Sequence, residues 1–348
     1  MRQTAIVIFF IISFCAFFSA KYKDSSKRLY WFICFVLCMF AALRPIGIDQ
    51  DSVGYQGYYE LNDLIWLVAE PSYGVISRIC QWLFNDFRAV LIVYAFAGVF
   101  LKFKAITRLT NLIWPTVLIY YSTYFLLHEF TQIRAGIASG IFLMAIPLIT
   151  EKKWVKYLFV VLICILFHYS SAILIFLFLL GNKPLNKKWT TILSLLIPFG
   201  IVLHYIGFTP DISIANEVAK TKIETYQTDA ETKTVALNVF NMVYMVKYLI
   251  FYVLLAFHKR ITPHSRYFPL LLKIFGISLF SYLALSSNTI FAMRISEMYG
   301  VVEIILIPFL VYTLRSSDLC KFLIWVIAIS YLFISIYSTE LIYATPKL

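Results

Sequence analysis

Charged residues are scarce in this sequence. Only 14% of its 348 residues are charged, whereas 61% are hydrophobic, and the mean hydropathy is +0.82. Soluble domains carry about 25% charged and about 45–50% apolar residues. This composition excludes the soluble α/β and β-sandwich classes, nucleic-acid-binding proteins and disordered chains. It predicts a protein that is folded within a lipid bilayer.

Several motifs with a known chemistry are also missing. The sequence has no G-x-x-x-x-G-K-[ST] loop, no H-E-x-x-H and no acidic pair at metal-ligand spacing. Its cysteines form no C-x-x-C pair, and we expect them to act as small apolar residues within helices. Nucleotide-driven transport and zinc chemistry therefore have no support, and we predict neither a metal nor a cofactor.

Apolar runs occur along the whole chain. A helix needs about 20 apolar residues to cross a bilayer, and short spans have about 17. We predict an all-α polytopic membrane bundle with about 12 spans, in which residues 1–348 form a single transmembrane domain. The predicted spans are residues 4–20, 29–43, 87–101, 112–127, 133–149, 157–167, 171–181, 189–206, 237–257, 267–285, 295–314 and 322–338.

The sixth and seventh runs are too short for upright spans. We predict that they form a broken pair that meets at His168, whereas one merged span would invert every later loop. With the break, most of the 30 basic residues lie on one side, which the positive-inside rule assigns to the cytoplasm. The loops that hold them are residues 21–28, 102–108, 152–156, 183–188, 259–266 and 315–321.

The opposite side holds two large polar segments. Residues 44–86 include apolar stretches too short to span a bilayer, at 61–69 and 75–84, which favour interfacial or re-entrant helices. Residues 207–236 form a second outer loop, either a mobile lid or a solvated connection. The first 20 residues resemble a signal peptide, but basic residues follow the apolar run, so we expect a retained helix with its N-terminus outside.

Arginines at the outer ends of the spans are candidate anion ligands. Arginine presents a planar fork that binds phosphate oxygens in pairs and stays ionised in a poor solvent. The alternative is contact with the phosphates of outer-leaflet lipids. The arginines at these positions are Arg44, Arg88, Arg134 and Arg294.

Three segments carry further polar groups beside these arginines. Residues 128–134 read His-Glu-Phe-Thr-Gln-Ile-Arg, and Gly136-x-x-x-Gly140 behind them allows another helix to approach closely. His168 is either a general base or a structural group that bonds a neighbour. Asp49 and Asp51 follow Arg44 and precede Tyr55; they either deprotonate an acceptor or bind sugar hydroxyls, or they belong to a turn.

Lys247 lies within the predicted span 237–257. A lysine that faces lipid is costly. We expect it either to line a cavity or to pair with an acid.

Together these segments resemble the EpsG family of bacterial exopolysaccharide, capsule and O-antigen synthesis, related in role to Wzy-type polymerases. The resemblance runs from Arg44 to Pro308. It rests on Arg-x-x-Gly-x-Asp with a downstream Tyr, on Gln-x-Arg-x-Gly-x-Ala, and on Leu-Phe-His-Tyr-Ser-Ser-Ala. The matching residues are Arg44, Gly47, Asp49 and Tyr55; Gln132, Arg134, Gly136 and Ala138; and His168 and Ser171. Asp51 competes with Asp49 for the aspartate position.

The resemblance implies a membrane glycosyltransferase at the periplasmic face of the bacterial inner membrane. It would transfer a growing glycan from undecaprenyl diphosphate to a lipid-linked repeat, with a chain-length regulator and a flippase as further partners beside membrane lipids, and no nucleic acid. Candidate catalytic residues are His168, Asp49, Asp51 and Glu129; candidate diphosphate ligands are Arg44, Arg134 and Arg294; candidate sugar ligands are Tyr55, Gln132 and His128. The alternatives are a transporter or flippase of lipid-linked oligosaccharide, a glycan ligase and a membrane acyltransferase.

Overall fold

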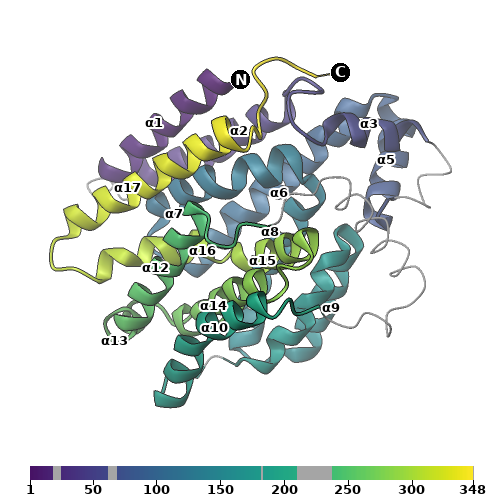
Figure 1. The fold of residues 1–348 in the computed structure, drawn as a ribbon. Helices are drawn as coiled ribbons and strands as arrows, with labels where there is room; N and C mark the ends of the chain where they lie inside the picture. The colour runs from purple at the N-terminus through teal and green to yellow at the C-terminus, as the bar shows by residue number, and fades with distance from the viewer. Residues whose placement is uncertain (19–24, 62–68, 182, 210–236, 348) are drawn as a thin grey trace. The chain divides into compact units, whose positions relative to one another are not determined.

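Helices make up all the regular structure in the described part of the chain. The computed structural model describes residues 1–348 except 19–24, 62–68, 182, 210–236 and 348 (Figure 1). The chain divides into two compact units, one made of Met1–Phe178 with Ile304–Leu348 and the other of Leu179–Glu303. Of the predicted outer loop at 207–236, residues 210–236 lie outside the described residues, as does most of the apolar stretch 61–69.

The first unit contains most of the long helices. Both chain ends lie close together in it, where Arg2 Nε donates to the carbonyl of Ile342 at 2.8 Å (Figure 1). Its elements are α1 (Arg2–Phe18), α2 (Ser25–Ala42), α3 (Ser52–Glu60), α5 (Pro71–Phe84), α6 (Phe87–Leu109), α7 (Ile113–Tyr120), the π-helix η3 (Tyr121–Thr131), α8 (Ile133–Thr150), α9 (Trp154–Phe167), η6 (Ile307–Tyr312), α17 (Ser317–Phe333) and η7 (Ile334–Ser338).

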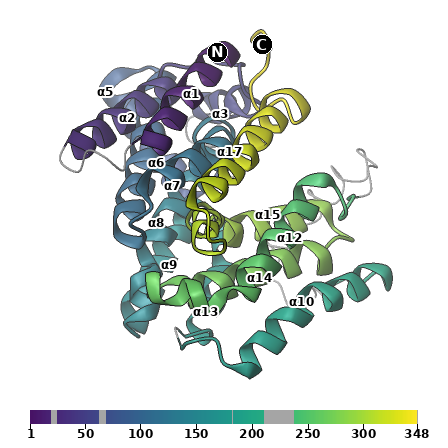
Figure 2. The same cartoon turned by 90° about the vertical axis from the view of Figure 1, so that its left-hand side faces the viewer.

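The second unit is built around α14 (Phe268–Ala284), most of whose residues are buried. Helices α10 (Lys187–Tyr205), α12 (Met242–Ala256) and α15 (Thr289–Gly300) pack against it (Figure 2). Two short helices, α13 (His258–Ile261) and η5 (Thr262–His264), follow α12. Along the chain, the division between the units falls within the 3-10 helix η4 (Tyr169–Leu179) and within α16 (Glu303–Leu306).

Four described helices are long and apolar enough to cross a membrane, and two further pairs qualify if each bent pair counts as one span. The bent pairs turn by 68° after Ala256 and by 45° after Gly300. Long apolar helices confirm the prediction of a helical membrane protein. The number of about 12 spans remains a prediction. The four single spans are Phe87–Leu109, Ile133–Thr150, Lys187–Tyr205 and Ser317–Ser338.

The predicted break at His168 is present. Helix α9 ends at Phe167, His168 has an extended backbone with φ −154° and ψ 115°, and the chain resumes as the 3-10 helix η4. A 3-10 helix rises about 2.0 Å per residue, whereas an α-helix rises about 1.5 Å. The helix η4 is therefore longer along its axis than an α-helix with the same number of residues.

The segment 102–108, predicted as a loop, is instead helical, because α6 continues to Leu109. Lys102 was expected in a cytoplasmic loop, yet its side chain is fully buried in the helix. Its Nζ lies 2.7 Å from Glu129 Oε1 and donates to the carbonyl of Gly136 at 2.6 Å. A basic residue that finds an acid inside the bundle does not mark the end of a span.

Glycines allow α6 and α8 to approach closely, as the Gly136-x-x-x-Gly140 spacing predicts. A Cβ at Gly140 would lie 2.9 Å from Leu101 Cβ, and one at Gly136 would crowd the carbonyl of His128. On α6, a Cβ at Gly98 would overlap the carboxylate of Glu129. The helix crossing therefore needs a small residue at Gly140, and the buried carboxylate of Glu129 needs small residues at Gly98 and Gly136.

The crossing yields a stability prediction. Gly98→Ala is expected to destabilise the protein by about 1–3 kcal/mol, because the added methyl displaces a carboxylate that two buried partners hold. Gly54→Ala is the matched control, since nothing lies within 4 Å of a Cβ there and alanine suits a helix better. Thermal unfolding in detergent, followed by circular dichroism, measures both. Equal melting temperatures for the two variants would contradict the proposed crowding.

Candidate functional site

Three charged or titratable side chains from distant parts of the sequence meet at one end of the first unit. Arg134 is the second residue of α8, Glu70 precedes α5, and His168 follows α9. Arg134 Nη1 donates to Glu70 Oε2, and His168 Nδ1 lies 3.4 Å from Glu70 Oε1. The side chains of Arg134, Glu70 and His168 are 19%, 8% and 12% exposed, so water reaches the group only in part.

The local sequence explains the backbone conformation of Glu70. It precedes Pro71, and a residue before proline avoids the helical conformation, so its backbone is extended with φ −65° and ψ 149°. Proline then begins α5 at the position where a missing N–H costs least. The Glu70 side chain makes no hydrogen bond that caps α5, and it reaches Arg134 instead.

Tyrosine rings surround the Arg134 guanidinium. Its Cζ lies 5.1 Å from the ring centroid of Tyr55, 5.9 Å from that of Tyr58 and 6.0 Å from that of Tyr73. Burial raises the pKa of the Tyr73 phenol above 10, so it stays protonated at neutral pH and donates to the carbonyl of Tyr55 at 2.6 Å. Arg134 Nε is buried and has no hydrogen-bond partner among the described residues. The hydrogen-bonding capacity of the Arg134 guanidinium is therefore only partly used.

Arg44 and Asp49 form a closed pair that lies apart from solvent. Arg44 Nε lies 3.0 Å from Asp49 Oδ2, and both side chains are 0% exposed. The other two guanidinium nitrogens donate to the carbonyls of Ala41 and Phe130 at 2.7 and 2.8 Å. All three nitrogens of Arg44 therefore have partners within the protein.

Asp49 and Asp51 shape the start of α3. Asp49 Oδ1 accepts from the backbone N–H groups of Asp51 and Ser52 at 3.1 and 2.9 Å. Asp51 stands at the N-cap of α3, and its side chain is partly exposed. The Asp49 carboxylate therefore orders the loop that leads to Tyr55. Their roles as catalytic groups stay predictions.

A tail from the C-terminal part of the chain holds the same loop. Lys347 N–H donates to the carbonyl of Gly47 at 2.8 Å, and Tyr343 N–H donates to that of Ile48 at 2.7 Å. Gly47 has φ +78°, and a Cβ there would overlap the Lys347 carbonyl. Glycine is needed at this position both for its backbone conformation and for this contact.

His128 and Glu129 point into the bundle, and each residue is about 1% exposed. His128 Nδ1 lies 3.1 Å from Ser139 Oγ. Glu129 Oε1 accepts from Tyr120 at 2.9 Å as well as from Lys102. The partners in these contacts do not belong to the Arg134 cluster. Gln132, at the end of η3, is partly exposed. Their roles as base and sugar ligands stay predictions.

Arg294 and Lys247 belong to the second unit. Arg294 is partly exposed on α15 and makes no ion pair with any described residue. Its role as a diphosphate ligand stays a prediction. Lys247 pairs with an acid, one of the two alternatives left open by the sequence: its Nζ lies 3.0 Å from Glu303 Oε1 and 5.2 Å from the ring centroid of Tyr244.

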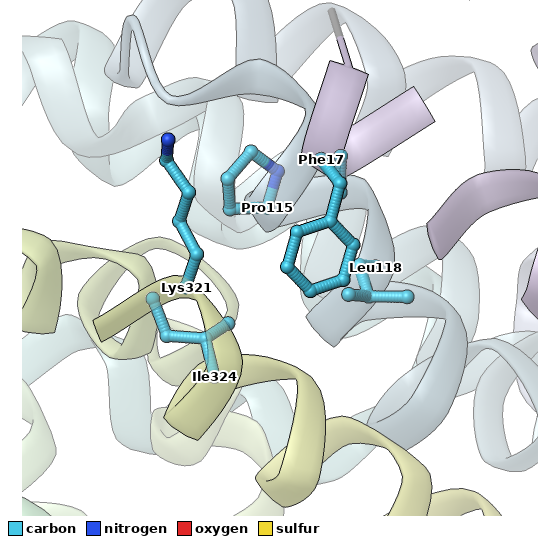
Figure 3. Close-up of a pocket in the computed structure, with 6 residues that line it drawn as sticks. Phe17, Pro115, Leu118, Lys321 and Ile324 are labelled. Carbon is cyan, nitrogen blue, oxygen red and sulfur yellow. The ribbon is translucent and has the colours of Figure 1, made fainter. Parts of the chain in front are cut away.

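A small pocket lies elsewhere in the first unit, between α1, α7 and α17 (Figure 3). Phe17, Pro115, Leu118 and Ile324 line it with apolar atoms, and Lys321 lies at its side. Its open volume of about 10 Å³ is close to the minimum for one water molecule. No predicted site residue lines it. Among the described residues, no three His, Cys, Asp or Glu side chains gather as metal ligands.

Long apolar helices that carry a charged, tyrosine-lined cluster at one end define a helical membrane protein with a polar site. The chain belongs to the EpsG family, whose sequence profile matches residues 27–345. It is similar to the amylovoran biosynthesis protein AmsC of Erwinia amylovora, with 22% identity over 94% of this chain and 92% of that protein. No solved structure matches the chain. The match confirms the family resemblance.

The buried Lys102–Glu129 pair yields a second prediction. Lys102→Met alone is expected to destabilise the protein by about 3–5 kcal/mol, because it leaves the Glu129 carboxylate buried without its cation. Adding Glu129→Gln is expected to recover most of that loss. Thermal unfolding of the two single variants and the double variant measures the coupling. A double variant no more stable than Lys102→Met alone would contradict the coupling of the two charges.

Proposed function

We propose that this protein is a polysaccharide polymerase that acts on lipid-linked repeats. One observation supports the proposal best: Arg134 and His168, singled out as anion ligand and general base from separate motifs, lie together with Glu70 in one cluster. Membership of the EpsG family and the similarity to an amylovoran biosynthesis protein support the same role. The carrier would be undecaprenyl diphosphate, with an O-antigen, capsule or exopolysaccharide as product.

The distribution of charge supports a site on the outer face of the inner membrane. The cluster lies where α6 and α8 begin and where α9 ends, whereas basic residues lie at the other ends of these helices. Cytoplasmic loops are enriched in lysine and arginine. We therefore assign the cluster to the periplasmic side, within about 12 spans and with residues 44–86 and 207–236 as outer loops. The basic residues are Lys104, Arg108, Lys152, Lys153 and Lys156.

The proposed reaction uses both parts of the cluster. The acceptor hydroxyl oxygen attacks the anomeric carbon of the donor, and its proton passes to His168. The bond between that carbon and the diphosphate oxygen breaks, and its electron pair leaves with the lipid diphosphate, whose charge Arg134 neutralises. Tyr55 is only 4% exposed, so Tyr58, which is partly exposed, offers the ring on which a sugar stacks. Arg44 and Asp49 hold the loop that positions Tyr55.

The proposed partners follow from the reaction. A flippase must supply the lipid-linked repeat to the outer face, and a chain-length regulator would act on the growing product. Membrane lipids surround the apolar helices. A transporter is the rival function, and the position of the intermediate separates the two: a defective polymerase leaves single repeats on the outer face, whereas a defective flippase leaves them inside.

Substitution of Arg134 tests the proposed function. Arg134→Ala is expected to abolish chain growth while the protein remains inserted, and Arg134→Lys to restore it only in part, because lysine cannot bind two oxygens at once. Arg78→Ala is the control, since Arg78 is exposed on α5 and is not among the candidate anion ligands. Polysaccharide ladders from complemented cells are the measurement. Full-length polymer from Arg134→Ala cells would refute the proposal.

Topology is tested by labelling with a membrane-impermeant thiol reagent. All six native cysteines are buried, so the background is expected to be low. A cysteine in place of Asn85, exposed between α5 and α6, should react in intact spheroplasts. A cysteine in place of Lys153, exposed between α8 and α9, should react only after the membrane is opened. The reverse pattern would place the Arg134 cluster on the cytoplasmic side.

A further inference from the structure

The ion pairs Arg44–Asp49 and Arg134–Glu70 differ in a way that bears on binding. Both Arg44 and Asp49 are 0% exposed, and all three guanidinium nitrogens of Arg44 have partners. Arg134 is 19% exposed, and its buried Nε has no hydrogen bond with a described residue. The Arg44 guanidinium therefore has no nitrogen left for a further partner, whereas the Arg134 guanidinium keeps part of its hydrogen-bonding capacity for another anion.

The rings around Arg134 restrict how an anion reaches it. Three tyrosine ring centroids lie 5.1–6.0 Å from its Cζ, so the polar edge of the guanidinium is the part left for an anion. Glu70 already binds to that edge. A carboxylate and a diphosphate repel each other, and one positive charge does not neutralise both. Binding of a diphosphate at Arg134 therefore requires Glu70 to move.

His168 provides a second position for the Glu70 carboxylate. The oxygen of Glu70 that faces away from Arg134 lies 3.4 Å from His168 Nδ1, so a small shift completes a hydrogen bond. A carboxylate beside an imidazole stabilises the imidazolium that forms when the imidazole accepts a proton. The same movement frees the cation and strengthens the base.

We infer that Glu70 is a displaceable counter-ion. The diphosphate of the lipid-linked donor takes its place on Arg134, and the released carboxylate settles against His168. This inference rests on the proposed function, because it takes the diphosphate as the ligand of Arg134. Glu70 is a positioning residue, since it acts through Arg134 and His168 and touches neither substrate. The device holds the Glu70 carboxylate on Arg134 until a donor is bound.

The inference predicts opposite effects on binding and on turnover. Glu70→Gln removes the competing charge, so undecaprenyl diphosphate should bind about threefold to tenfold more tightly to the full-length protein in lipid nanodiscs. Polymer formed in complemented cells should fall at least about tenfold, because the imidazolium loses its carboxylate. If Glu70 only supported the fold, its substitution would weaken both diphosphate binding and polymer formation. Glu60→Gln is the matched control, since Glu60 is an exposed acid at the end of α3.

Further variants make each outcome decisive. Glu70→Asp keeps the charge but shortens its reach, so it should tighten binding about twofold to threefold and retain more polymer than Glu70→Gln. If Glu70→Gln fails to fold, the binding measured for Glu70→Asp tests the inference. Binding by both Glu70 variants that is equal to or weaker than wild type overturns the inference and leaves the proposed function intact. Wild-type binding that Arg134→Ala does not weaken overturns the proposed function, and the inference with it.

Discussion

A charge within a bilayer must find an opposite charge, and this requirement organises the described structure. Lys102 meets Glu129, Arg44 meets Asp49, and Lys247 meets Glu303. An isolated charge at the centre of a membrane costs about 2.5–3.5 kcal/mol on insertion scales, and more in other estimates. The pairs Lys102–Glu129 and Lys247–Glu303 therefore fix which helices can be neighbours, whereas Arg44–Asp49 closes the loop that precedes α3. The pair Arg134–Glu70 follows the same rule but remains partly open to water, which is what a binding site requires.

Small residues and ion pairs depend on each other here. Helices α6 and α8 approach closely at Gly140, which faces Leu101, while Gly98 and Gly136 leave room for the Glu129 carboxylate between them. Lys102 in turn donates to the carbonyl of Gly136. This crossing supports the start of α8, and hence Arg134. The rigidity of the site thus derives from contacts that lie below it in the bundle.

The sequence predicted the features that depend on local composition. Two apolar runs too short to span a bilayer located the break at His168, and the Gly136-x-x-x-Gly140 spacing predicted a close crossing. The end of α6 was misplaced because a lysine was taken as the edge of the membrane, and its acid partner is 27 residues away. Glu70 was missed for a similar reason: 64 residues separate it from Arg134. A lone acid before a proline in an apolar segment was the one signal available.

The contacts between Lys347 and Gly47 and between Tyr343 and Ile48 have a consequence for biosynthesis. A ribosome delivers residues 47 and 48 to the membrane long before residues 343 and 347 emerge. During that interval the segment that leads to Tyr55 lacks two of its backbone partners. The segment that leads to Tyr55 therefore completes its contacts only after residues 343–347 have been synthesised, and a nascent chain arrested earlier would be inserted without them.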